Sequence, residues 1–104
     1  EQFGPVLPLL KFDDYDDVVA RANATEYGLG GSIWGNDEDK AFEIAKRIQS
    51  GTVWVNEVQH LSPTAAFGGV KQSGLGVEGG EEGLLEYTNA QTLVRKKRAP
   101  APAG

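Results

Sequence analysis

Few side chains in this 104-residue chain could do chemistry. There is one histidine, His60, and no cysteine. The chain by itself therefore excludes a multi-histidine metal site, a cysteine zinc site and a thiol nucleophile, and a Ser–His–Asp triad would depend entirely on His60. His60 follows an apolar stretch, and loops after strand ends carry many ligand sites in α/β folds. A ligand-binding role and a plain hydrogen-bonding role within the loop both stay open for this residue.

A second candidate is the pair Lys71 and Ser73, which could be drawn as a Ser–Lys nucleophile. A spacing of two residues does not place both side chains on one helical face, and no third group follows to orient them. We therefore interpret both as structural residues of a loop.

Residues 74–79 match the glycine pattern G-x-G-x-x-G of dinucleotide-binding folds. That motif needs a strand before it and an acidic residue about twenty positions after it, to hold the ribose. The preceding residues 67–73 do not read as a strand, and no acidic residue follows Glu86. We interpret the glycines as a turn that leads into a helix.

Charge and hydropathy exclude several partners. The net charge of −5 argues against nucleic acid, and the basic run 95–98 lacks the interleaved aromatic side chains of a single-strand binder. No apolar run approaches the ~20 residues of a membrane span, and the first residues show no signal peptide. The sequence predicts no nucleic-acid partner, no membrane partner and a cytoplasmic location.

The first half of the chain predicts alternating strands and helices. Residues 6–12 form an apolar run typical of a strand. A helix follows, with Tyr15, Val18, Val19 and Ala22 on one face. Residues 32–34 predict a short strand. A second helix begins at Asn36 or Asp37 as N-cap, carries Ala41, Ile44, Ala45 and Ile48 on one face, and ends with Gly51 at the left-handed C′ position.

The second half contains one clear strand at 52–56, rich in β-branched and aromatic residues. A long irregular segment then runs from Glu57 to about Gly80. Residues 81–88 predict a short helix with Leu84 and Leu85 inward, and residues 91–94 predict a last strand. The fold class is therefore α/β: a β-α-β-α-β segment with parallel strands, a long glycine-rich loop, a short helix and a final strand.

Five stretches together resemble the C-terminal portion of the aldehyde dehydrogenase superfamily. They occur in family order at residues 1–6 (EQFGPV), 27–30 (YGLG), 51–56 (GTVWVN), 67–74 (FGGVKQSG) and 81–88 (EEGLLEYT). The resemblance implies that the chain is about the last fifth of an NAD(P)-dependent enzyme that oxidises an aldehyde to a carboxylic acid. The family's cofactor domain, catalytic cysteine and general-base glutamate match no residue here, so the chain alone is expected to be inactive.

The resemblance also implies roles for five residues. Glu1 matches the glutamate that holds the nicotinamide ribose of NAD or NADP, and Phe3 matches the aromatic side chain beside the nicotinamide. Gln59, Leu61 and Phe67 match positions of the aldehyde tunnel; simple packing is the alternative for Phe67.

The expected domain organisation follows from the same match. Residues 1–89 would belong to the catalytic domain, residues 90–98 would be an oligomerisation strand of a homodimer or homotetramer, and residues 99–104 would be a disordered tail. A different interpretation is a non-catalytic, stand-alone protein-interaction module that adds its last strand to another sheet.

Overall fold

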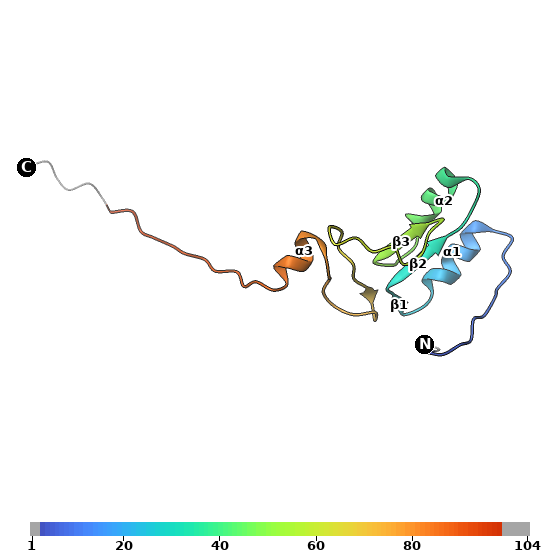
Figure 1. The fold of residues 1–104 in the computed structure, drawn as a ribbon, viewed down its shortest axis with the longest axis horizontal. Helices are drawn as coiled ribbons and strands as arrows, with labels where there is room; N and C mark the ends of the chain where they lie inside the picture. Colours follow the sequence, from blue (N-terminus) through green and yellow to red (C-terminus); the bar gives the residue numbers. More distant parts are fainter. Residues whose placement is uncertain (1–2, 99–104) are drawn as a thin grey trace, which may run out of the picture.

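The structure is a computed structural model that describes residues 3–98. The elements in chain order are helix α1 (Tyr15–Asn23), strands β1 (Tyr27–Gly28) and β2 (Gly30–Ile33), helix α2 (Glu38–Ala45), strands β3 (Thr52–Val55) and β4 (Val70–Lys71), and helix α3 (Gly80–Leu85). In Figure 1 both longer helices lie beside the β2–β3 sheet, and the chain after α3 extends away from this body. The α/β class predicted from the sequence is confirmed.

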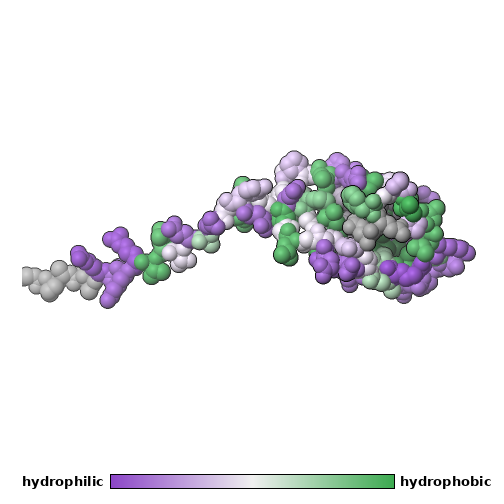
Figure 2. All heavy atoms as spheres, turned by 90° about the horizontal axis from the view of Figure 1, so that it is seen from below, coloured by the Kyte–Doolittle hydropathy of each residue, from purple (hydrophilic) through white to green (hydrophobic). Residues whose placement is uncertain are grey.

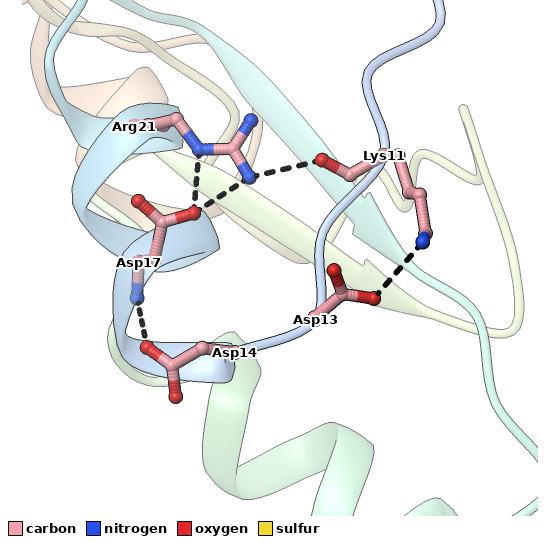
Figure 3. A network of polar contacts seen from close by, with 5 residues as sticks. All are labelled: Lys11, Asp13, Asp14, Asp17 and Arg21. Atoms are coloured by element: carbon pink, nitrogen blue, oxygen red, sulfur yellow. Dashed lines mark hydrogen bonds and ion pairs between the residues drawn. The ribbon is translucent and has the colours of Figure 1, made fainter.

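Helix α1 contains the four apolar residues that the sequence places on one helical face, and an acidic residue caps its start. The carboxylate of Asp14 accepts a hydrogen bond of 2.8 Å from the backbone N–H of Asp17. Figure 3 shows how the guanidinium of Arg21 then joins the carboxylate of Asp17 to the carbonyl oxygen of Lys11. Asp14 therefore starts helix α1, and Asp17 ties it to the segment before it.

The unit β2–α2–β3 is the centre of the fold. Its strands are parallel, with Gly30 opposite Thr52 and Ile33 opposite Val55, and α2 is the crossover between them. The carboxylate of Asp37 accepts a 3.0 Å hydrogen bond from the N–H of Lys40, so Asp37 is the N-cap. This confirms the predicted parallel strands with a crossover helix.

The predicted C′ role of Gly51 is wrong. Helix α2 ends at Ala45, and Gly51 is not one of the glycines with positive φ. Its backbone lies against that of Gly68, and a Cβ at Gly51 would overlap the Gly68 carbonyl oxygen. The position needs a glycine because two segments cross closely there.

A second pairing, which the sequence does not predict, joins distant parts of the chain. Strand β1 pairs antiparallel with β4, with Tyr27 opposite Lys71 and Gly28 opposite Val70. The long segment after β3 therefore returns to the fold and contains the short strand β4, within residues that do not read as a strand in the sequence.

The predicted strands at 6–12 and 91–94 do not form within residues 3–98. A strand requires a neighbouring strand to pair its backbone groups, and neither segment lies in one of the two sheets. Both segments are exposed, with Leu9 at 90% and Val94 at 90% exposure. The oligomerisation role of residues 90–98 stays a prediction, and residues 99–104 lie outside the described part.

Helix α3 also differs from the prediction. Its buried residue is Gly83, which packs against the backbone of Glu78. Leu84 and Leu85 are 67% and 57% exposed, so the prediction that they face inward is wrong for the chain by itself. The close helix–loop contact at Gly83 turns the leucines outward.

The hydrophobic core is small. Among residues 3–98 the buried hydrophobic side chains are Val19, Ala41 and Ala45, whereas many large apolar side chains reach the surface. Figure 2 shows hydrophobic patches between hydrophilic ones on the body and along the narrow C-terminal stretch. A groove of about 520 Å³ with a mainly apolar lining lies between α1 and α2. No helix in the described part of the chain combines the length and the hydropathy needed to cross a bilayer.

Candidate functional site

The segment that follows β3 is tied back to that strand by a tryptophan. The indole N–H of Trp54 donates a 2.8 Å hydrogen bond to the carbonyl oxygen of His60. Asn56 and Gln59 have positive φ values of 54° and 56°, so the backbone turns sharply between these two points. The polar start of the predicted tunnel loop thus folds over the end of β3.

Phe67 closes the same loop from its other end. Its ring lies beside the ring of Trp54, with centroids 6.5 Å apart and planes inclined by 35°. Its backbone N–H and carbonyl group both exchange 2.7 Å hydrogen bonds with Glu78. Phe67 is therefore half-buried between β3 and the glycine-rich segment.

Two hollows meet at Phe67. One, of about 270 Å³, is lined by Leu61, Pro63 and Glu78 among others. The other, of about 350 Å³, lies on the side of Gly76. Of the three predicted tunnel residues, Leu61 and Phe67 share the smaller hollow, while Gln59 does not line it.

The side chain of His60 contacts its own loop. Its Nδ1 atom lies 3.1 Å from a carboxylate oxygen of Glu57, and both side chains are largely exposed. Within residues 3–98 no three histidine or acidic side chains are grouped so that they could hold a metal ion. The contact with Glu57 is compatible with a role within the loop, and the ligand-binding role of His60 stays a prediction.

Phe3, one of the two predicted cofactor residues, does not pack against this loop. Phe3 is 99% exposed, so both faces of its ring are open and it packs against none of the tunnel residues. Glu1 lies outside the described residues. The structure thus brings together Leu61 and Phe67 and leaves Phe3 apart from them.

Lys71 and Ser73 have structural partners, as the sequence interpretation proposes. The ammonium group of Lys71 donates hydrogen bonds to the carbonyl oxygens of Asn23 and Thr25, at 2.8 and 3.1 Å. The hydroxyl of Ser73 accepts a 2.8 Å hydrogen bond from the N–H of Gly28. Neither side chain is arranged as a nucleophile with a base.

The G-x-G-x-x-G segment has none of the geometry of a dinucleotide site. The strand before it, β4, has two residues and is antiparallel to its partner, whereas the motif requires a parallel β-α-β unit. Gly74, Gly76 and Gly79 all have positive φ, which suits a turn. The interpretation as a turn before α3 agrees with the structure.

Sequence reasoning misses two residues that contact Phe67, namely Trp54 and Glu78. Trp54 reads simply as a strand residue, and only its position at the carboxyl end of β3 hints at a role in a site. The backbone of Glu78 forms hydrogen bonds with the backbone of Phe67, and no sequence pattern predicts this pairing. Taken together, the hollow at Leu61 and Phe67 has apolar side chains beside the polar residues Ser62 and Glu78, a surface that can bind and orient a molecule.

Comparison with known proteins gives a consistent match. Residues 1–93 match the aldehyde dehydrogenase family. Aldehyde dehydrogenase 1A1 of Bos taurus is 50% identical over 96 residues, which cover 92% of this chain and 19% of that protein. Retinaldehyde dehydrogenase 3 of Homo sapiens is 47% identical with the same coverage. The chain thus spans about a fifth of the length of these relatives.

Solved structures agree with the sequence matches. The NAD-dependent aldehyde dehydrogenase of Sinorhizobium meliloti superposes with a TM-score of 0.84 at 42% identity, over 96% of this chain and 20% of that one. A variant of betaine aldehyde dehydrogenase from Staphylococcus aureus in complex with NAD+ gives a TM-score of 0.80 at 42% identity, over 84% and 18%.

Proposed function

Because the chain belongs to the aldehyde dehydrogenase family, we propose that it is the C-terminal part of an enzyme that oxidises an aldehyde to a carboxylic acid with NAD or NADP. In this proposal the chain supplies one wall of the aldehyde tunnel, a contact to the nicotinamide end of the cofactor, and contacts to other subunits. The nucleophile and the general base belong to the rest of the enzyme.

The observation that carries the proposal is the hollow shared by Leu61 and Phe67 beside Trp54. Its lining combines apolar side chains, such as Leu61 and Phe67, with the polar residues Ser62 and Glu78. Such a surface can hold the carbon chain of an aldehyde and leave its carbonyl free for reaction elsewhere. Gln59, whose backbone is turned at the start of the loop, would act at the tunnel mouth.

The high exposure of Phe3 leaves its ring available for a contact with the cofactor. A nicotinamide ring is flat, and the open faces of the Phe3 ring offer it an apolar wall. Glu1 would accept hydrogen bonds from the ribose hydroxyls, since a carboxylate can accept two. When bound, the cofactor supplies the hydride acceptor. The printed names of two similar structures include NAD, which supports a nicotinamide cofactor, and the proposal keeps both NAD and NADP.

The experiment is to join this chain to the part of Bos taurus aldehyde dehydrogenase 1A1 that it does not match, and to assay the complete subunit. We expect reduction of NAD with an aldehyde substrate by the complete subunit and none by the 104-residue chain. Phe67→Ala should raise KM for a bulky aldehyde by about tenfold, the scale of an apolar wall contact. Phe42→Ala on α2 is the control, because Phe42 lines none of these hollows. A folded but inactive complete subunit would overturn the proposal.

The exposed stretch after α3 favours one alternative, a protein-interaction module without catalysis. Leu93 and Val94 are 85% and 90% exposed, and such a segment could add a strand to a partner sheet. A pull-down with the intact chain distinguishes the enzyme from the interaction module. The module predicts a discrete partner that is lost in Leu93→Lys, and no gain of activity in the complete subunit.

The cytoplasmic location of the protein stays a prediction.

A further inference from the structure

Lys71 is the residue that connects the loop to helix α1. Its ammonium group reaches the carbonyl oxygens of Asn23 and Thr25, at 2.8 and 3.1 Å. Asn23 is the last residue of α1, where the carbonyl groups lack partners within the helix and the helix dipole is negative. A positive group with several donors suits that position.

Besides the Lys71 ammonium group, a short strand pairing and a few hydrogen bonds hold this segment. Strand β4 contains only Val70 and Lys71, and Lys71 has a φ of 56°, a conformation that a residue with a side chain rarely adopts. Ser73 accepts one hydrogen bond from Gly28, and Gln72 donates one to the carbonyl oxygen of Glu26. The two bonds of the ammonium group therefore offset the unfavourable backbone geometry.

Only three residues separate Lys71 from Phe67, and two of them are Gly68 and Gly69. Both glycines are tightly packed: Gly68 lies against Gly51, and a Cβ at Gly69 would come within 2.6 Å of the side chain of Ser73. A shift of β4 would therefore be passed along the packed glycines to Phe67.

We propose that Lys71 is a positioning residue that fixes the Phe67 ring against Trp54 and so sets the width of the aldehyde tunnel. The inference rests on the proposed function, because it assigns Phe67 to the tunnel wall. Lys71 itself touches neither aldehyde nor cofactor in this proposal; it acts through the backbone of residues 67–71.

The hydrogen bond of Lys71 to Asn23 also connects it to the turn after α2. The side-chain amide of Asn23 donates to the carbonyl oxygen of Arg47 and accepts from the N–H of Gln49, both at 2.8 Å. Through Asn23, Lys71 is thus linked to the turn that leads into β3, the strand that carries Trp54. Both sides of the Trp54–Phe67 contact are therefore held by one network.

The test uses the complete subunit with Lys71→Met, which keeps the length of the side chain and removes the ammonium group. Lys71→Arg keeps a charge and donors for two carbonyl groups. Lys46→Met is the matched control, since Lys46 is an exposed lysine at the C-cap of α2 whose ammonium group pairs with Glu43 and contacts none of the residues of the Lys71–Asn23 network. For each protein, KM is measured for one small and one bulky aldehyde, together with KM for NAD.

We expect Lys71→Met to change the ratio of the two aldehyde KM values by about fivefold to tenfold, the range of a displaced apolar wall. KM for NAD should stay constant, and Lys71→Arg should restore most of the ratio. Equal effects on both aldehydes and on NAD would show a general structural role and overturn the inference, as would no effect at all.

A second readout separates this inference from the proposed function. Hydrogen exchange at the amides of Phe67 and Glu78, which form a mutual pair, reports the position of the loop without any catalysis. Lys71→Met should speed that exchange, while Lys46→Met should not. If the complete subunit is inactive but exchange is faster in Lys71→Met, the proposed function is contradicted and the positioning role of Lys71 is supported. If exchange is unchanged in Lys71→Met, the positioning role of Lys71 is overturned.

Discussion

The backbones of Gly51 and Gly68 touch, and no side chain fits between them. Gly51 immediately precedes β3, and Gly68 immediately follows Phe67. This contact brings the start of the central strand to the end of the tunnel loop, although 16 residues lie between the two glycines in the sequence.

Gly51→Ala should therefore destabilise the fold. The added methyl group overlaps the Gly68 carbonyl oxygen, and relief requires a backbone shift, which costs about 1–3 kcal/mol or more. Urea denaturation of the complete subunit, followed by tryptophan fluorescence, measures the loss. Gly35→Ala is the control: its Cβ would meet the nearest atom at 4.0 Å, an ordinary contact. Equal midpoints for both variants would contradict the prediction.

Asn56 should be sensitive to substitution because it does two things at once. Its side chain accepts from the N–H of Gly35 at 2.8 Å and donates to the carbonyl oxygen of Gly35 at 2.9 Å, and its φ is 54°. Asn56→Ala loses both bonds and keeps the strained backbone, so we expect a loss of about 1–3 kcal/mol. Asn56→Gly relieves the backbone and should lose less. If glycine is no better than alanine in urea denaturation, the backbone part of the argument is wrong.

The N-cap of α2 offers a smaller, cleaner test. Asp37→Ala removes the acceptor for the N–H of Lys40 and should destabilise the fold by about 1 kcal/mol. Asp37→Ser keeps an acceptor and should recover most of that loss. Thermal unfolding followed by far-ultraviolet circular dichroism ranks the three proteins; an order other than parent, serine, alanine would contradict the capping role.

The 104-residue chain by itself should associate with itself or swap elements. Its large apolar side chains are widely exposed, with Leu9 at 90% and Leu93 at 85%, and each of the two sheets found in residues 3–98 has two strands. Two-stranded sheets are marginal in water, and open edges and apolar patches attract other chains. Sedimentation velocity over a range of concentrations measures this.

We expect sedimentation coefficients that rise with concentration. The double substitution Leu93→Lys with Val94→Lys places charges on the exposed stretch and should reduce the association. A clean monomer with a sharp, cooperative thermal transition would disprove the prediction for the parent chain.

The local elements could be predicted because their signals are local. The apolar spacing from Tyr15 to Ala22 predicts α1, and Asp37 before Ala41 and Ala45 predicts the start of α2. The family resemblance, carried by five short motifs, leads to the same α/β class as the alternation of elements.

The long-range features could not be predicted in the same way. The pairing of Gly28 with Val70 depends on two residues in each strand, too few for a periodic pattern. The glycine requirement at 51 comes from Gly68, a contact that no local rule contains. Residues 6–12 have the composition of a strand and no partner strand in the described part of the chain, so composition alone gave the wrong structure.

The β2–β3 and β1–β4 pairings also differ in the length of the chain segment that each one closes into a loop. Joining Gly30 to Thr52 closes a loop about half as long as the loop closed by joining Tyr27 to Lys71. Loop-closure entropy grows with length, and contacts that are near in sequence form sooner. The β2–α2–β3 unit should thus be the folding nucleus, with β4 and the loop before it attaching afterwards. Substitutions in the unit would slow refolding, and substitutions at the β1–β4 contact would mainly accelerate unfolding.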